Sequence, residues 1–155
     1  MPLIIATGSN LNDRYNNLLE AKSALSQSFS FIEESRVYLS KAVDYENQPD
    51  FYNQVLVFKT PGAEPQEIMT QILKIEATLG RTREVLRGPR TIDIDILFID
   101  NVTSNTDHLT LPHPRLFDRS FVVLPLMELS CFESLTNNYE FKTSFDNFAS
   151  PLNFD

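Results

Sequence analysis

Hydrophobic residues at the start of the chain form a short run that a polar turn interrupts. The apolar residues 3–6 are followed by Gly8-Ser9-Asn10, so we predict a buried strand that runs into a loop. Asn12 is placed to cap a helix after this loop. In that helix, apolar residues recur at three- and four-residue spacing and form one stripe, which comprises Leu18, Ala21 and Leu25. The pattern predicts a helix that packs one face against the protein.

Two further strands are predicted at residues 31–39 and 52–60, with a polar loop between them. The second contains Val55-Leu56-Val57-Phe58, and β-branched and aromatic residues favour strands. A second helix begins near Pro65 and ends before Gly80, because proline favours the first turn of a helix and glycine favours its end. Its apolar face consists of Ile68, Ile72, Ile75 and Leu79.

Residues 92–99 alternate between isoleucines and aspartates before the run becomes uniformly apolar. This pattern is typical of a strand in the middle of a sheet with one end at a polar site. The resulting order is strand-helix-strand-strand-helix-strand, which matches the ferredoxin-like α+β sandwich, an antiparallel sheet with two helices on one face. We expect one domain over residues 1–155, because the chain has the usual length of a single globular domain.

The chain continues past this pattern with an apolar C-terminal extension. Five of the twelve phenylalanines lie there, at positions 132, 141, 145, 148 and 154. A segment this rich in aromatic residues is too apolar to remain a solvated tail. We therefore expect the extension to pack against the domain.

The charge of the chain is acidic overall but basic in one place. Thirteen Lys and Arg against twenty-one Asp and Glu give a formal net charge of −8, which disfavours binding to nucleic acid or to an anionic membrane. Half of the arginines nevertheless lie close together in the sequence, at Arg81, Arg83, Arg87 and Arg90. A local cationic patch on an acidic protein favours a small and highly charged ligand.

Two absences in the sequence point to the cytoplasm. No apolar run approaches the ~18 residues that span a bilayer, and residues 1–6 lack the basic start and longer apolar stretch of a signal peptide. Cys131 is the only cysteine, so no intrachain disulfide can form, in agreement with a reducing compartment. We expect a cytoplasmic protein that acts as a monomer.

Asp93 and Asp95 form a pair of carboxylates on one predicted strand. They are separated by one residue, so their side chains project from the same face, about 6.5 to 7 Å apart along the backbone. Two such carboxylates are costly to bury unless a cation neutralises them, and hard oxygen ligands favour Mg²⁺. The alternative is a solvated strand face with paired salt bridges.

Arginines and a histidine lie near this pair in the sequence. Gly80-Arg81-Thr82-Arg83 and Gly88-Pro89-Arg90-Thr91 precede the aspartates, and guanidinium groups pair well with phosphate oxygens. His113 lies between two prolines that restrict its backbone, and it is placed to bind a phosphate. The alternative is a histidine that only caps a loop; metal ligation is less favoured, because His108 is the only other histidine. The Walker A pattern does not occur in the sequence, so the chain is not a P-loop protein.

The segment 87–97, Arg-Gly-Pro-Arg-Thr-Ile-Asp-Ile-Asp-Ile-Leu, is the longest of several motifs along the chain. The others lie at residues 8–11, 48–53, 75–81 and 111–126. In order and spacing they resemble the 6-hydroxymethyl-7,8-dihydropterin pyrophosphokinase family, and the resemblance covers most of the chain, up to the start of the C-terminal extension. It implies a ferredoxin-like fold and the transfer of the β,γ-pyrophosphate of ATP to the hydroxymethyl group of the pterin.

The resemblance also implies roles for individual residues. It implies that Asp93 and Asp95 are catalytic and hold two Mg²⁺ ions against ATP. Arg81 and Arg90 are implied to contact the phosphates and to take part in catalysis. Further contacts with ATP are implied for a set of residues spread along the chain: Glu76, Arg83, Arg87, Ile96, Thr110, His113 and Arg119. The pterin is implied to lie between two aromatic rings and to be read by an amide, with contacts to Ser40, Val43, Phe51, Asn53 and Phe121.

The chain departs from the family just before Gly88. Many members have an aromatic residue there that closes over the pterin, whereas this chain has Arg87, and the loop that starts at Arg83 is one residue shorter. Either Arg87 replaces the ring by stacking its guanidinium group on the pterin, or the pterin is held less tightly. We predict that residues 81–88 form a closing lid, because a glycine-bounded loop that carries arginines is suited to closure.

Two other classes of function remain open from the sequence. The first is an inactive ferredoxin-like module that binds a ligand without turnover; the presence of both aspartates, the arginine cluster and His113 argues against it. The second is an RNA-binding ferredoxin-like domain, which needs a basic face and a glycine-aromatic signature that this chain lacks. The expected partners are therefore two small molecules, ATP and the hydroxymethyldihydropterin, and neither nucleic acid nor a membrane.

Overall fold

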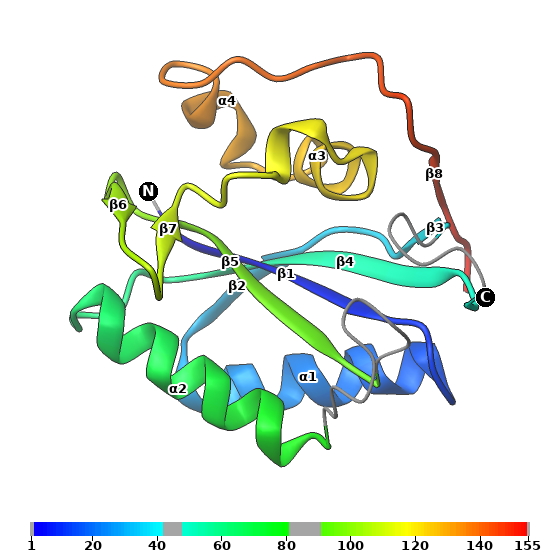
Figure 1. Ribbon diagram of the computed structural model, residues 1–155, viewed down its shortest axis with the longest axis horizontal. Coiled ribbons are helices and arrows are strands. Elements are labelled where there is room, and N and C mark those ends of the chain that lie inside the picture. Colours follow the sequence, from blue (N-terminus) through cyan, green and yellow to red (C-terminus); the bar gives the residue numbers. More distant parts are fainter. Residues whose placement is uncertain (1, 42–47, 81–90, 155) are drawn as a thin grey trace.

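The structure, a computed structural model, describes residues 2–41, 48–80 and 91–154. An antiparallel sheet at its centre carries helices on both faces (Figure 1). The two longer helices lie on one face: α1 (Arg14–Ser28) and α2 (Pro65–Thr78). The shorter helical segments lie on the other: η1 (Leu116–Asp118), α3 (Ser120–Leu126) and α4 (Phe132–Leu135).

The order of the strands in the sheet is β5-β1-β4-β3-β8, and β2 pairs with β4 next to β3. Every pairing is antiparallel. The strands are β1 (Leu3–Ser9), β2 (Phe31–Glu34), β3 (Tyr38–Ser40), β4 (Phe51–Phe58), β5 (Asp93–Ile99) and β8 (Ala149–Pro151). A separate two-stranded ladder joins β6 (Ser104–Asn105) to β7 (Thr110–Leu111). The predicted ferredoxin-like α+β sandwich, with two helices on one face of an antiparallel sheet, is confirmed.

The ends of the two long helices follow from their flanking residues. The carboxylate of Asp13 caps α1 and accepts the Asn16 N–H at 3.1 Å. The prediction that Asn12 is the cap is wrong: Asn12 instead makes the preceding turn with a φ of 59°, which asparagine tolerates better than most residues. In α2, Pro65 is the first helical residue and Gly80 follows its end with a φ of 83°, as predicted.

The strand predicted over residues 31–39 is divided into β2 and β3. Between them, Ser35 takes over the pairing with β4: its N–H donates to the Val55 carbonyl at 2.9 Å, and its hydroxyl oxygen accepts the Val55 N–H at 3.0 Å. A register shift within β2 accompanies this interruption. Non-local pairing with β4 therefore decides where the strand breaks.

β5 is the edge strand of the sheet, so its predicted place in the middle of the sheet is wrong. Its apolar side chains are nevertheless buried, because hydrophobic residues cover both of its faces. Two contacts protect its outer edge: the Glu76 carboxylate accepts the Ile94 N–H at 2.8 Å, and the Leu97 carbonyl accepts the His113 N–H at 3.0 Å. Burial alone does not distinguish a central strand from an edge strand protected in this way.

A hydrophobic core lies on each face of the sheet. The core under α1 and α2 includes Leu3, Ile5, Leu18, Leu25, Phe58, Ile68, Ile72, Ile94 and Ile96. The core under α3 and α4 includes Ile4, Val55, Val57, Val122, Leu126 and Leu135. A register shift between Ile4 and Ile5 places the consecutive residues Leu97 and Phe98 in the second core together. The second core ends where β5 presents its aspartates, and the candidate site lies at this polar boundary.

The C-terminal extension packs on the domain, which confirms the sequence prediction. Phe132 and Phe141 contact each other beside the second core. β8 pairs with the outer edge of β3, and Phe154 stacks on Tyr15 with ring centroids 4.2 Å apart. Figure 1 shows the segment crossing from α4 over α3 to the edge of the sheet. Within the described part of the chain, no helix is long and apolar enough to cross a membrane.

Candidate functional site

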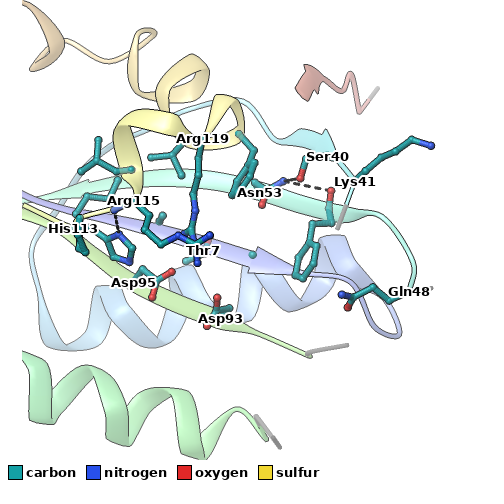
Figure 2. Close-up of a pocket in the computed structure, with 18 residues that line it drawn as sticks. Thr7, Ser40, Lys41, Gln48, Asn53, Asp93, Asp95, His113, Arg115 and Arg119 are labelled. Atoms are coloured by element: carbon teal, nitrogen blue, oxygen red, sulfur yellow. Dashed lines mark hydrogen bonds between the residues drawn. The ribbon is translucent and has the colours of Figure 1, made fainter. Parts of the chain in front are cut away.

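A cavity of about 410 Å³ lies on the sheet face that carries α3. Its floor comes from β1, β4 and β5, and residues 113–122 form one wall. Figure 2 shows an elongated arrangement, with His113 and Asp95 toward one end and Asn53, Ser40 and Gln48 toward the other. The fold brings these polar groups together from parts of the chain that are far apart in the sequence.

The two aspartates lie on the cavity side of β5. Asp93 pairs with Gly8 and Asp95 pairs with Ala6 on the neighbouring β1, and both carboxylates are partly buried. Because these partners have little or no side chain, nothing large on β1 covers the carboxylates. Ile94 and Ile96, between and after them, point to the opposite face and are each 5% exposed. The alternation of β5 thus divides its residues between the hydrophobic core and the cavity.

His113 lies against the outer edge of β5 and beside Asp95 (Figure 2). Its backbone N–H donates to the Leu97 carbonyl at 3.0 Å, which fixes the residue to the strand. Its ring nitrogen Nδ1 accepts the Arg115 N–H at 3.3 Å. A neutral ring that accepts at Nδ1 carries its hydrogen on Nε2, so the ring is a hydrogen-bond donor at that atom.

The protonation of His113 is set by its surroundings. Burial has the largest effect and, with the positive charges of Arg119 and Arg115, lowers the pKa of His113 to about 4. The negative charge of Asp93 opposes this shift but does not reverse it. His113 is therefore neutral near pH 7. Its ring can donate one hydrogen bond and does not supply a fixed positive charge.

Positive charge at this end of the cavity comes from Arg115 and Arg119. Both line the cavity, from the segment that leads into α3. The Arg119 side chain runs from the start of α3 toward the sheet (Figure 2), and its guanidinium carbon lies 5.7 Å from the centroid of the Phe121 ring. The cavity thus has carboxylates on its floor and guanidinium groups on its wall. This arrangement suits an anionic ligand that is bridged to the carboxylates by a cation.

The other end of the cavity is built around Asn53 of β4. Asn53, Gly8 and Asp93 lie in one row across three strands. The side-chain N–H groups of Asn53 donate to the Ser40 hydroxyl at 2.8 Å and to the Tyr38 carbonyl at 3.3 Å. Its Oδ1 consequently turns toward Gly8, where an added Cβ would lie 3.5 Å from it.

Two aromatic rings line the same cavity as this amide. Phe51 lies on β4, and a Cβ added at Gly8 would lie 3.7 Å from its ring. Phe121 contributes to the cavity from α3. A flat heterocycle fits between such rings with its polar edge on an amide. The glycine leaves the floor between Asn53 and Phe51 open for it.

The structure separates other predicted site residues from the cavity lining. Glu76 is 5% exposed and lies on the helix side of the sheet, where it holds the Ile94 N–H. The Ile96 side chain is part of the core under α1 and α2. Thr110 lies on β7, paired with Asn105, and does not line the cavity. Val43, Arg81, Arg83, Arg87 and Arg90, and with them the predicted lid 81–88, lie outside the described residues.

Several cavity residues were not among the sequence candidates. Gly8 and Arg115 lie within recognised motifs, so their motifs were a signal for them. Arg119, which the resemblance implies to contact ATP, lines the cavity together with Arg115. Ala6, Thr7, Lys41, Gln48, Leu97, Pro114, Leu116 and Val122 complete the lining. Of these, Gln48, Leu97, Pro114, Leu116 and Val122 also lie within the motifs, whereas Ala6, Thr7 and Lys41 carry no pattern that marks a site before the strands are assembled.

The aspartate pair is the part of the site suited to a metal. No group of three or more His, Cys, Asp or Glu residues suited to a metal occurs among the described residues. Mg²⁺ does not require one, since it keeps several water ligands and binds through one or two carboxylates together with phosphate oxygens. Two hard carboxylates on the floor of a cavity with cationic walls are therefore suited to Mg²⁺.

The fold and the cavity place the chain in the class of α+β sandwich proteins that have a ligand cavity on one face of an antiparallel sheet. The sequence profile of the 7,8-dihydro-6-hydroxymethylpterin-pyrophosphokinase (HPPK) family matches residues 4–131. The chain belongs to this family, whose activity is the transfer of pyrophosphate to a hydroxymethylpterin in folate biosynthesis.

Individual relatives agree with this assignment. The chain is 41% identical over 127 residues to 2-amino-4-hydroxy-6-hydroxymethyldihydropteridine pyrophosphokinase of Bacillus subtilis, covering 81% of this chain and 75% of the relative. The protein of the same name from Aquifex aeolicus is 42% identical over 125 residues, covering 81% and 78%. The folic acid synthesis protein fol1 of Pneumocystis carinii is 37% identical over 127 residues, and there the chain spans only 17% of the relative's length.

Solved structures show the same fold at low sequence identity. A Plasmodium falciparum HPPK-DHPS triple mutant superposes with a TM-score of 0.63 at 15% identity, covering 83% of this chain and 39% of the other. An HPPK-DHPS in complex with substrates gives a TM-score of 0.65 at 13% identity, covering 93% and 43%. These likenesses support the fold of the domain, and the matched chains extend well beyond it.

Proposed function

We propose that this chain transfers the β,γ-pyrophosphate of ATP to the hydroxymethyl group of 6-hydroxymethyl-7,8-dihydropterin, with AMP and the pterin diphosphate as products. The observation that carries the proposal is the cavity itself. It combines two carboxylates, two arginines and a neutral histidine at one end with an amide and two aromatic rings at the other. Membership of the pyrophosphokinase family supports the same reaction. We also propose that the protein works in the cytoplasm as a monomer.

The two ends of the cavity suit the two substrates. The pterin ring occupies the end over Gly8, between Phe51 and Phe121, where Asn53 Oδ1 accepts a hydrogen bond from its polar edge. The phosphates of ATP occupy the end with Asp93 and Asp95 and the cationic wall. Because the two ends share one cavity, the pterin hydroxymethyl group and the β-phosphate are brought within reach of each other.

Asp93 and Asp95 are proposed to hold two Mg²⁺ ions. Bound Mg²⁺ supplies positive charge that offsets the negative charge of the transferred phosphates. The carboxylates contribute by their fixed place on a strand whose backbone is paired with β1 on one side. Their same-face spacing allows them to act together on one triphosphate chain.

The reaction forms a bond between the pterin hydroxymethyl oxygen and the β-phosphorus. The bond between that phosphorus and the oxygen bridging to the α-phosphate breaks, so that AMP leaves with this oxygen. Asp95 lies where it can orient the hydroxyl group or accept its proton, and the assignment of a general base stays open between these roles. His113 Nε2–H donates to a phosphate oxygen, and the Arg119 guanidinium group stabilises the charge that develops there.

The arginines at positions 81 and 90 remain proposed phosphate ligands and participants in catalysis, and Arg83 and Arg87 remain proposed contacts of ATP. The same holds for Glu76, Ile96 and Thr110. The Glu76 side chain binds the Ile94 N–H, so Glu76 contributes by supporting β5. The Ile96 side chain lies in the core, so Ile96 contributes through its backbone. Ser40 and Val43 remain proposed contacts of the pterin.

The test is AMP formation from ATP and Mg²⁺ in the presence and absence of 6-hydroxymethyl-7,8-dihydropterin. We expect AMP release that depends on the pterin and is lost in the Asp95→Ala variant, because the variant lacks half of the carboxylate pair. Asp107→Ala, which removes an exposed carboxylate from a loop, is the matched control and should retain activity. A folded wild-type protein that binds ATP without producing AMP would instead support the inactive-module alternative, which nothing in the family match favours.

A further inference from the structure

The C-terminal extension of this chain touches both walls of the cavity. The family profile ends at residue 131, and the segment that makes these contacts follows that boundary. At one point, Asn147 binds the turn that opens α3. Two residues later, β8 pairs with β3, with Ala149 opposite Ser40. Residues 147–151 thus connect the wall formed by the start of α3 with the wall formed by β3, as the path of the chain in Figure 1 also shows.

Asn147 supplies the cap that α3 lacks in its own sequence. Arg119 stands at the N-cap position of α3, and its side chain makes no capping hydrogen bond. Asn147 Oδ1 accepts the Ser120 N–H at 2.7 Å and the Ser120 hydroxyl at 2.5 Å. Its Nδ2 donates to the Asp118 carbonyl at 2.8 Å and to the Asp146 carboxylate at 3.0 Å. One side chain from 27 positions along the chain therefore holds both ends of the Asp118–Ser120 turn.

The residues on either side of Ser120 are those that line the cavity. Ser120 is 1% exposed and is not part of the lining, whereas Arg119 and Phe121 both are. Asn147 holds the backbone and the hydroxyl group of Ser120. The turn that carries the Arg119 and Phe121 side chains is therefore fixed. An ion pair between Lys142 and Asp118 adds a second contact between the extension and the same turn.

We propose that Asn147 is a positioning residue that sets Arg119 and Phe121 against the two substrates by capping α3 from the C-terminal extension. The inference rests on the proposed function, because its effect is expressed through the binding of a phosphate chain by Arg119 and of a flat ring by Phe121. Asn147 does not line the cavity and takes no direct part in the chemistry.

The first experiment compares steady-state kinetics of the wild type with Asn147→Ala, Asn147→Asp and Asn138→Ala. Asn147→Ala is expected to raise the KM values of both substrates roughly tenfold, since a lost cap lets both side chains shift by a fraction of an ångström or more. Asn147→Asp keeps an oxygen that accepts from Ser120 but loses the N–H that is donated to the Asp118 carbonyl and sets a second carboxylate beside Asp146, so it is expected to restore only part of the loss. Asn138→Ala removes an exposed asparagine of the same extension and should match the wild type.

A double-mutant cycle separates positioning from a general loss of stability. If Asn147 acts through Arg119, then Asn147→Ala added to Arg119→Ala should raise the KM for ATP by less than it does in the wild-type background. Ser120→Ala, which removes one of the three bonds to the turn, serves as a milder variant should Asn147→Ala fail to fold. A KM for ATP and for the pterin unchanged in folded Asn147→Ala, with only the melting temperature lowered, overturns the proposal.

Failure of the proposed function is distinguishable from failure of this inference. Absence of pterin-dependent AMP from the wild type contradicts the reaction, whatever the variants do. In that case the dissociation constants of a non-hydrolysable ATP analogue, measured with Mg²⁺ by calorimetry, still test the inference. Equal affinities of the wild type and Asn147→Ala for the analogue would overturn it, and a weaker affinity of Asn147→Ala that Asn147→Asp restores in part would support it.

Discussion

At the scale of single residues, the cavity depends on a small residue, Gly8, as much as on its charged residues. Gly8 lies in the row between Asn53 and Asp93, where any side chain would stand on the cavity floor. An added Cβ would meet Asn53 Oδ1 at 3.5 Å and the Phe51 ring at 3.7 Å, which are ordinary contact distances. The glycine is therefore explained by the space a ligand needs rather than by strain in the backbone.

We predict that Gly8→Ala raises the KM for the pterin by roughly tenfold and changes the KM for ATP much less, because the added methyl group displaces the pterin ring from the cavity floor. Its melting temperature should stay near that of the wild type. Gly62→Ala is the matched control, since an added Cβ there has no heavy atom within 4 Å. Equal pterin KM values in Gly8→Ala and the wild type would show that the pterin does not lie over β1.

His113 gives a prediction for pH. Burial lowers the pKa of His113 from 6.5 to about 4 in the folded protein. Between these values the unfolded chain binds a proton that the folded chain does not, so the free energy of unfolding falls as the pH falls from about 6.5 to about 4. In metal-free buffer, urea unfolding of His113→Gln should show a weaker loss of stability across this window than the wild type.

The matched variant for this measurement is His108→Gln, which replaces the exposed histidine of the chain. We expect it to retain the wild-type dependence on pH. The activity of the wild type should also show no loss on deprotonation of His113 between pH 5 and 8, because the ring is already neutral there. A rise in stability of the wild type between pH 6.5 and 4 would contradict the burial of a neutral ring.

At the scale of elements, β5 shows how an edge strand is made suitable for a site. Its inner edge pairs with β1, and its outer edge is held by Glu76 from α2 and by the His113 backbone. Glu76 is buried, and its carboxylate accepts a hydrogen bond from the N–H of Ile94, the residue between the two aspartates. The helix therefore anchors the strand at the point where its carboxylates must keep their spacing.

We predict that Glu76→Ala lowers the free energy of unfolding by about 1–3 kcal/mol, because it leaves the buried Ile94 N–H without its acceptor. The KM for ATP should rise as well, since the backbone between Asp93 and Asp95 loses an anchor. Urea unfolding and steady-state kinetics measure the two effects. Glu67→Ala, on the exposed first turn of the same helix, should cost only a few tenths of a kcal/mol through the helix dipole.

At the scale of the whole molecule, one sheet joins two cores. The side chains of β1, β4 and β5 alternate between the core under α1 and α2 and the core under α3 and α4. Loss of either core exposes one face of the same strands. The C-terminal extension adds to the second core and to the edge of the sheet, so the last residues of the chain contribute to the same cooperative unit.

We predict that the protein unfolds in a single transition, and that Leu126→Ala lowers its free energy of unfolding by about 2–5 kcal/mol because the fully buried side chain leaves a cavity. Far-ultraviolet circular dichroism and tyrosine fluorescence should give the same midpoint. Leu19→Ala, at a position 45% exposed on α1, is the control and should change stability little. Separate transitions for the two probes would show that the two cores unfold independently.

Much of this protein follows from local pattern. The periodicity of residues 3–99 predicted the order of strands and helices and the ferredoxin-like sandwich, because repeats of two and of three to four residues decide which side chains share a face. The same rule placed Asp93 and Asp95 side by side and away from the isoleucines between and beside them. A proline and a glycine marked the ends of α2 for equally local reasons.

Only the tertiary structure decided which residues pack against each strand, helix and side chain. β5 is an edge strand whose outer edge is covered by α2 and the His113 segment. The burial pattern of its residues would be the same if another strand covered that edge. His113 is neutral because of the wall around it, and Asn147 caps a helix that its own sequence leaves uncapped. These features rest on contacts between residues far apart in the chain, and the order of residue types along a sequence does not specify such contacts until the chain has folded.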